Sequence, residues 1–256
     1  MISTMQNKIK NALLSAVSIF FWILLWHIGA YFANKKLLFK IPTPLDTLKE
    51  LSICIGDSAF WLAVGNSLIH IIIGFISAVI IGLLCGLLSG NSQLFRIFSS
   101  PISRLIRSVP VAAFIVLAWL WTPTTVIPSF ISFLMVFPIV WLQVENSLLG
   151  VDKKLIEMSE IMGMTKKGII INIKLPALLP ALRNSSITGL GFAWKSGVAA
   201  EVICNPTGSI GALLSNAKSN IEFSRVFAIV FAIIILSLIL ENIMKLLWRE
   251  KRHDKI

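Results

Sequence analysis

The sequence has few charged residues and few cysteines, and both shortages exclude classes of protein. Only 14% of its 256 residues are charged, whereas a soluble domain carries about 25%. Cys54, Cys85 and Cys204 show neither a CxxC pair nor the Cys/His spacing of a metal site. No Walker-type G-x-x-x-x-G-K-[ST] motif occurs either, which excludes a P-loop nucleotide site on this chain. The composition therefore does not indicate a soluble metalloenzyme or a P-loop ATPase.

The chain contains long apolar runs with few or no charged residues. Hydrophobic residues make up 56% of the chain, and the mean hydropathy is +0.86. A helix needs about 20 apolar residues to cross a bilayer, and lipid offers no partner to unpaired backbone groups. The runs predict six spans, at Ala12–Phe32, Asn66–Leu88, Leu105–Trp121, Ile127–Val144, Leu178–Val202 and Phe223–Leu247. We therefore expect an all-α membrane protein, with residues 1–256 forming one transmembrane domain.

The basic residues indicate which way these spans are oriented. The net charge is +11, but the basic residues cluster between apolar runs, as the positive-inside rule requires, so a nucleic-acid partner is not indicated. Most of them fall on the inner side when the N-terminus is cytoplasmic, and six spans then place both termini there. The basic N-terminal residues precede an apolar stretch too long for a signal peptide and lacking a small-residue cleavage site, so we expect a retained first helix. Cys54 and Cys204 fall on the same outer side, which leaves a disulfide between them open.

Small residues and prolines predict how the spans pack. Every fourth position of the second span is small, at Gly74, Ala78, Gly82, Gly86 and Gly90. Such a stripe lets a neighbouring helix approach closely. Prolines in the third and fourth spans, at positions 110, 128 and 138, remove backbone hydrogen bonds and favour kinks.

The inner stretch over residues 145–177 is the longest cytoplasmic segment. Its apolar residues Val151, Leu155, Met158 and Met162 recur at helical spacing and predict one face packed against the bundle, with a polar tip toward the cytoplasm. Gly163 is expected to end this helix in a left-handed conformation, and Thr165 to cap the next one. That second helix covers Ile169–Ile173 and is expected to stop near Pro176. The pattern alone fits a docking hairpin and an amphipathic interfacial helix about equally well.

The same stretch resembles the cytoplasmic loop of ABC importer permeases. That loop has the form E-A-A, three residues, G, nine residues, I-x-L-P. This chain has Glu157-Met158-Ser159, then Gly163, then Ile173-Lys174-Leu175-Pro176 at the same spacing, and departs from it only at Met158 and Ser159.

Outside the loop, Pro42 to Leu247 resembles the sulfonate, nitrate and taurine branch of these permeases. The matching features are Pro42-Thr43-Pro44, Arg107-Ser108-Val109-Pro110, Ala200-Glu201 and Gly208–Gly211. Family members often have Trp-Phe-Gly where this chain has Trp121-Thr122-Pro123, and this departure bears on the substrate branch.

The resemblance implies a type I importer permease with six transmembrane helices and a coupling-helix hairpin, in the inner membrane of a bacterial cell. Its implied partners are a second permease copy (or a pseudo-equivalent permease), two cytoplasmic ATPase subunits that bind ATP and Mg, and an extracytoplasmic solute-binding protein. The permease itself is expected to hold no cofactor or metal and to be no enzyme. The residues expected to couple to the ATPase are Glu157, Met158, Ser159, Glu160, Gly163, Met164, Thr165, Ile173, Leu175 and Pro176.

Three residues near the outer end of the fifth span are candidates for the translocation path. Lys195 either faces the path, where it favours an anionic solute, or snorkels to lipid headgroups. Trp194 either lines the path or anchors the interface, and Glu201 lies at an outer gate or meets the binding protein. The two histidines inside apolar spans, His27 and His70, lack any catalytic or ligand pattern, so packing is the simpler interpretation.

Two other kinds of function remain as alternatives. An ion-coupled secondary transporter is expected to carry inverted repeats and intramembrane carboxylates, and an intramembrane enzyme needs a nucleophile–base pair or a metal cluster. Neither pattern is visible here. The branch resemblance implies a small anion such as a sulfonate or nitrate, with a thiamine-precursor pyrimidine or a flavin as the alternative solute.

Overall fold

The computed structural model describes residues 2–35 and 40–248, and over these residues it contains helices and no strands. This confirms the all-α prediction. The helices are α1 (Ile2–Asn34), α2 (Pro44–Gly56), α3 (Ser58–Asn91), α4 (Gln93–Ser108), α5 (Val111–Trp119), α6 (Ile127–Leu149), α7 (Lys153–Ile161), α8 (Lys166–Ile169), a π-helical turn (Ile170–Lys174), α9 (Leu175–Cys204), α10 (Ile210–Ser219) and α11 (Phe223–Leu247).

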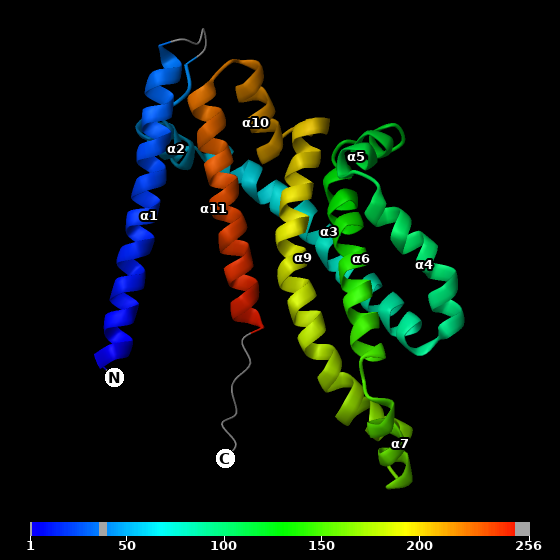
Figure 1. The fold of residues 1–256 in the computed structure, drawn as a ribbon. Helices are drawn as coiled ribbons and strands as arrows, with labels where there is room; N and C mark the ends of the chain where they lie inside the picture. Colours follow the sequence, from blue (N-terminus) through cyan, green and yellow to red (C-terminus); the bar gives the residue numbers. More distant parts are fainter. Residues whose placement is uncertain (1, 36–39, 249–256) are drawn as a thin grey trace.

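Helices α1, α6, α9 and α11 run roughly lengthwise, α3 crosses α6 and α9 obliquely, and α2, α5, α7 and α10 lie at the ends of the molecule (Figure 1). Helices α2, α5 and α10 lie at one end, and α7 lies at the opposite end, beyond α6 and α9. Helix α1 lies beside α11, where Trp26 stacks on Phe227 and Phe231 at ring-centroid distances of 5.9 and 6.2 Å. The first residues of α1 and the last turn of α11 lie at the α7 end of the molecule.

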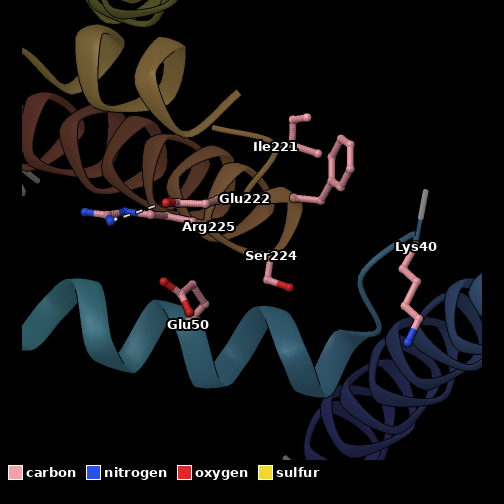
Figure 2. Close-up of a pocket in the computed structure, with 7 residues that line it drawn as sticks. Lys40, Glu50, Ile221, Glu222, Ser224 and Arg225 are labelled. Carbon is pink, nitrogen blue, oxygen red and sulfur yellow. Dashed lines mark ion pairs between the residues drawn. The ribbon is translucent and has the colours of Figure 1, made fainter. Parts of the chain in front are cut away.

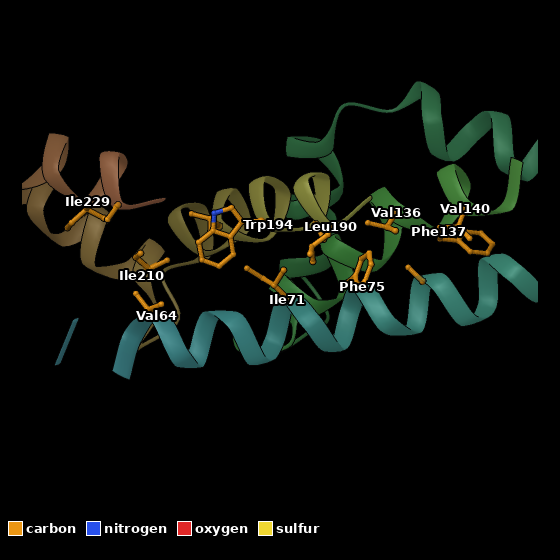
Figure 3. Close-up of a cluster of buried hydrophobic side chains, with 14 of the residues drawn as sticks. Val64, Ile71, Phe75, Val136, Phe137, Val140, Leu190, Trp194, Ile210 and Ile229 are labelled. Atoms are coloured by element: carbon orange, nitrogen blue, oxygen red, sulfur yellow. The ribbon is translucent and has the colours of Figure 1, made fainter. Parts of the chain in front are cut away.

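Helices α3, α6 and α9 form the packed centre of the molecule. The small-residue stripe of α3 lies against α6: a Cβ added at Gly86 would lie 2.5 Å from Val144 Cβ, and one added at Gly82 would lie 3.0 Å from Val140 Cβ. This confirms the close packing predicted for the stripe. Large apolar side chains of α3, α6 and α9, including Ile71, Phe75, Val136 and Trp194, fill the space beside it (Figure 3).

Within the described part of the chain, four helices are long and apolar enough to cross a membrane, over Leu13–Asn34, Ser58–Asn91, Ile127–Leu149 and Phe223–Leu247. Helix α9 has 30 residues but is not among them, and Arg183, Lys195 and Glu201 lie along its length. A fifth span exists if α4 and α5, which are bent by 96° relative to each other, count as one.

The single helix predicted over Leu105–Trp121 is wrong, because α4 ends at Ser108 and α5 begins at Val111. Pro110 lies in this break, where its missing N–H cannot continue the α-helical ladder. The other two prolines do not interrupt a helix: Pro128 lies in the first turn of α6, and α6 continues through Pro138.

Candidate functional site

The hairpin between α6 and α9 begins with a capped helix. The side chain of Asp152 accepts a hydrogen bond of 2.9 Å from the Lys154 backbone N–H at the start of α7. Ser159, on the inward side of this helix, is buried, and its hydroxyl donates to the Leu155 carbonyl at 2.7 Å. The Asp152 cap was missed from the sequence, although an aspartate directly before a helical run is the expected signal.

Gly163 makes the turn at the tip of the hairpin with a φ of +81°. The N–H of Met164 donates to the Ser159 carbonyl at 2.9 Å, and that of Gly163 donates to Glu160 at 3.0 Å. This pair of bonds is the Schellman arrangement that closes a helix C-terminus. The Thr165 hydroxyl then accepts from the Gly168 N–H at 3.2 Å. The structure therefore confirms both predicted caps.

The second arm of the hairpin, which leads into α9, differs from the prediction. The helix expected to stop near Pro176 does not stop there: α8 passes through a π-helical turn into α9, and Pro176 lies in the first turn of α9. The Leu175 N–H donates to the carbonyl of Ile170, five residues back. The wider π turn shifts the backbone hydrogen bonds just before the proline, which itself has no N–H to donate, so the chain stays helical. Ile173, Leu175 and Pro176 are therefore parts of a continuous helical segment.

The apolar stripe of α7 faces outward, and the prediction that it packs on the bundle is wrong. Leu155 is 49% exposed, Met158 61% and Met162 83%, and the neighbouring Ile161 is 86% exposed. The carboxylates of the same helix, Glu157 and Glu160, are exposed as well. The tip of the hairpin is thus a surface of methionine, isoleucine and glutamate that no described element covers.

The base of the hairpin is tied to the packed centre. The Ser147 hydroxyl at the end of α6 donates to the Ala177 carbonyl at 2.6 Å, and the Lys174 ammonium donates to Asn91 Oδ1 at the end of α3 at 2.7 Å. Ile169 of α8 is buried. The hairpin is therefore anchored to α3, α6 and α9 together.

One face of α9 is polar and uncovered. Asn184, Thr188, Phe192 and Lys195 are spaced by four, four and three residues, and all four are exposed. Polar groups at membrane depth are stable only where they meet water or protein. This face carries Lys195, the lysine that is a candidate for the path.

A small cavity of about 190 Å³ lies between α4, α6 and α9 beside this face. Arg107 is the one charged residue among those that line it, and Phe192, Met135 and Pro138 are among the others. Sequence reasoning used Arg107 only as part of a resemblance, because its position beside α9 depends on the break at Pro110.

The other two candidates for the path lie in the interior. Trp194 has no exposed surface, and its indole N–H donates to the Ile233 carbonyl of α11 at 3.0 Å. It is a core residue and lines no path here. Glu201 is 1% exposed; its Oε2 accepts from the Ser67 hydroxyl at 2.8 Å and from the Gly211 N–H at 3.1 Å. Glu201 therefore offers almost no surface to a docked protein in this structure.

A wider pocket of about 490 Å³ opens at the opposite end from the hairpin, between α2 and the start of α11 (Figure 2). Glu50 of α2 faces the Glu222–Arg225 pair of α11 across it, and the two members of that pair are 3.5 Å apart. The lining residues are Lys40, Glu50, Ile221, Glu222, Phe223, Ser224 and Arg225. Charges of both signs thus meet at this end of the molecule.

Within residues 2–35 and 40–248, no three His, Cys, Asp or Glu side chains form a group that could hold a metal ion. Cys54, Cys85 and Cys204 are free thiols, so the disulfide left open between Cys54 and Cys204 is not formed in this structure.

Comparison with known proteins finds relatives that are all transport permeases. A family model described as "binding-protein-dependent transport system inner membrane component" matches residues 78–253. The putative aliphatic sulfonates transport permease protein SsuC of Bacillus subtilis is 28% identical over 246 residues, which cover 94% of this chain and 86% of SsuC. The nitrate import permease protein NrtB of Synechocystis is 25% identical, covering 73% of this chain and 71% of NrtB. The taurine transport system permease protein TauC of Escherichia coli is 27% identical, covering 69% of this chain and 66% of TauC.

Two solved structures share the fold. A bacterial ABC transporter involved in the import of alginate aligns with a TM-score of 0.61 at 16% identity, covering 98% of this chain and 97% of its own. The MetNI methionine ABC transporter in an inward-facing conformation aligns with a TM-score of 0.54 at 22% identity, covering 74% of this chain and 95% of its own.

Proposed function

This chain belongs to the family of binding-protein-dependent transport system inner membrane components, and we propose that its α7–α8 hairpin is the element through which a separate ATPase drives transport. As a family member it is the permease subunit of an ABC importer, a multi-pass inner membrane protein that is not itself catalytic. Such an importer implies an ATPase and a binding protein as partners. The role of the hairpin, the number of spans, the assembly and the solute are our proposals.

The exposed tip of the hairpin is the observation that carries the proposal. Met158, Ile161 and Met162 expose apolar surface beside Glu157 and Glu160, a combination suited to an apolar cleft with basic residues at its rim. Methionine-rich surfaces repack readily on a partner, and exposed apolar patches mark interaction sites. The two bonds at the hairpin base then carry its displacement into α3, α6 and α9, which would move as one body.

We propose six spans, with α9 and the bent α4–α5 pair joining the four strongly apolar helices. The first residues of α1 and the last turn of α11 lie at the hairpin end (Figure 1), which supports placing both termini on the cytoplasmic side with the ATPase. The end that carries α2, α5 and α10 would then face outward and receive the binding protein. Its mixed charges, around Glu50 and Arg225, suit a polar and reversible contact.

The uncovered polar face of α9 supports a dimeric assembly with the path between two copies. Lys195 on this face and Arg107 in the adjoining cavity would give the path a positive potential, which raises the local concentration of anions. We therefore propose a small oxyanion as the solute, a sulfonate or nitrate of the kind that the names of the relatives describe.

Replacement of Gly163 tests the coupling role. A valine at φ +81° meets no neighbour within 4 Å of its Cβ but must adopt a left-handed backbone, which costs about 1–2 kcal/mol or more for a β-branched residue. We expect Gly163→Val to remodel the tip and to abolish transport in proteoliposomes that contain the ATPase and the solute-loaded binding protein. The binding protein should also no longer stimulate ATP hydrolysis. The subunit should still insert and accumulate, because the bundle is untouched.

Gly65→Ala is the matched control, because Gly65 lies inside helix α3 with nothing within 4 Å of its added Cβ. It should transport like the parent chain. Normal transport by Gly163→Val would refute the coupling role of the hairpin.

A further inference from the structure

A third cavity lies at the outer end of the bundle, away from the hairpin. It has a volume of about 220 Å³ and lies between α3, α9, the start of α6 and the turn before α10. Its lining residues are Asn66, His70, Thr125, Pro128, Glu201, Pro206, Thr207, Gly208 and Ser209. Thr125, Thr207 and Gly208 are exposed, whereas Glu201 is almost fully buried. The cavity therefore runs inward from the surface to a carboxylate.

The bonding of Glu201 is unequal at its two oxygens. Oε2 accepts from Ser67 and from the Gly211 N–H, and Ser67 in turn accepts from the Ile210 N–H at 3.0 Å. Oε1 is buried, and no described residue donates a hydrogen bond to it. Among the described residues the one ion pair joins Glu222 and Arg225, so Glu201 is in none, and the cavity lining contains His70 but no lysine or arginine. A buried carboxylate without a counter-charge costs several kcal/mol.

The rest of the lining is rich in oxygen. Thr125 and Thr207 are lining residues with hydroxyl groups, whereas the Ser209 hydroxyl already donates to the Pro206 carbonyl at 2.9 Å and accepts from the Ala212 N–H at 3.1 Å. Asn66 donates its amide Nδ2 to the Gly208 carbonyl at 3.0 Å, so its Oδ1 remains an acceptor. One carboxylate with neutral oxygen ligands suits a hard cation of low charge. Divalent ions usually take more carboxylate ligands than the single one present here.

We propose that this cavity binds a small monovalent cation, either an alkali metal ion or a primary ammonium group, with Glu201 Oε1 as its counter-charge. Through Ser67, Gly211 and Ile210 the same carboxylate joins α3, α9 and α10. An occupied site would therefore stabilise the outer end of the bundle. This inference does not depend on the coupling role of the hairpin or on the solute.

Thermal unfolding of the purified chain in lipid nanodiscs tests the site. The midpoint is measured in N-methylglucamine chloride, whose cation is too bulky for the cavity, and again as sodium, potassium or methylammonium chloride replaces it at constant ionic strength. We expect a saturable rise of about 5–10 °C at a hundredfold excess over Kd for at least one of the three. A response to sodium or potassium identifies a metal-ion site, and a response to methylammonium alone identifies an amine site. Equal midpoints in all four salts would overturn the proposal.

Glu201→Gln locates the effect. Its amide oxygen can still accept from Ser67 and Gly211, while its NH₂ replaces the cation with an uncharged donor. We expect this variant to fold and to lose the salt response, whereas Glu222→Gln, at a carboxylate outside the cavity, keeps it. A salt response that survives in Glu201→Gln also refutes the site.

Thr207→Val, at an exposed lining position, removes one oxygen ligand without touching the buried carboxylate. Thr207→Val therefore tests the site even if Glu201→Gln does not accumulate. We expect it to raise the apparent Kd about threefold or more, and an unchanged Kd would exclude this cavity as the location.

Discussion

The contact between α3 and α6 can be tested with one methyl group. A Cβ added at Gly86 would lie 2.5 and 2.6 Å from Cβ and Cγ1 of Val144 and 2.8 Å from the Trp141 carbonyl oxygen, whereas favourable carbon contacts lie at about 3.5–4.0 Å. The carbonyl belongs to the backbone and cannot rotate away, so the two helices must separate. Overpacking of this kind costs about 1–3 kcal/mol. Separation would also strain the bond of 2.9 Å from the Trp141 indole to Ser89.

Alanine in place of glycine also improves helix propensity by about 1 kcal/mol, and this gain must be removed from the comparison. Gly65→Ala supplies the same gain on the same helix, with nothing within 4 Å of the new methyl group. We expect Gly86→Ala to be less stable than Gly65→Ala by about 1–3 kcal/mol. Reversible unfolding in mixed micelles with rising SDS, followed by tryptophan fluorescence, measures this difference. Variants within about 0.5 kcal/mol of each other would show that α3 and α6 are not in close contact.

Two further sets of substitutions test the N-cap of α2 and the proposed anion path. Thr43→Ala removes the N-cap of α2 and should lower stability by about 1 kcal/mol. The hydrogen bond from the Thr43 hydroxyl holds the pKa of Asp46 below its ordinary value of 3.8. The stabilisation by ionised Asp46 is thus complete above that value and lost as pH falls through the lower folded-state pKa, so the difference between the thermal midpoints of parent and variant should narrow below pH 3.8. The bond from the Asp46 N–H to the Thr43 hydroxyl persists in the parent and leaves a smaller difference. Arg107→Gln and Lys195→Gln should each slow anion uptake about tenfold, with Arg104→Gln, which is outside the cavity lining, as control; equal rates in all three variants would refute the anion path.

The turn of the hairpin could be predicted because its rules are local. The left-handed conformation at Gly163 needs only the absence of a Cβ, and the Thr165 cap needs only a hydroxyl three residues before an N–H. The register of the α3 stripe follows equally simply from the spacing of its small residues. Each of these features depends on residues within one or two helical turns.

The features that sequence reasoning missed depend on contacts between distant segments. Helical spacing shows that Leu155, Met158 and Met162 share a face, but it does not show whether the bundle or a separate protein covers that face. Trp194 and Glu201 were assigned by their distance along the fifth span, whereas their surroundings come from Ile233 and Ser67 on other helices. No pattern within α9 contains that information.

The bend between α4 and α5 shows a different limit. Hydropathy predicted one span over Leu105–Trp121, since apolar residues outnumber Arg107 and Ser108 before Pro110 and follow it without a charge. The proline signal was visible, but its consequence depends on whether neighbouring helices hold the chain straight, as they do around Pro138 within α6. The 96° bend at Pro110 is the case in which they do not.

The contacts among α3, α6 and α9 also determine how a displacement of the hairpin would be transmitted through the bundle. Glycines of α3 hold its backbone against α6, and α9 packs on both, so bending one of the three helices would break contacts along the other two. The ends of α3 and α9 away from the hairpin are joined again through Glu201 and Ser67. Helix α5 packs on α6 and α9 only through a smaller cluster, in which Ile115 meets Ile131 and Ala200, and it is joined to α4 by the break at Pro110. Rotation of α3, α6 and α9 as one body, with the bent pair adjusting beside them, therefore costs fewer contacts than deformation within the three helices.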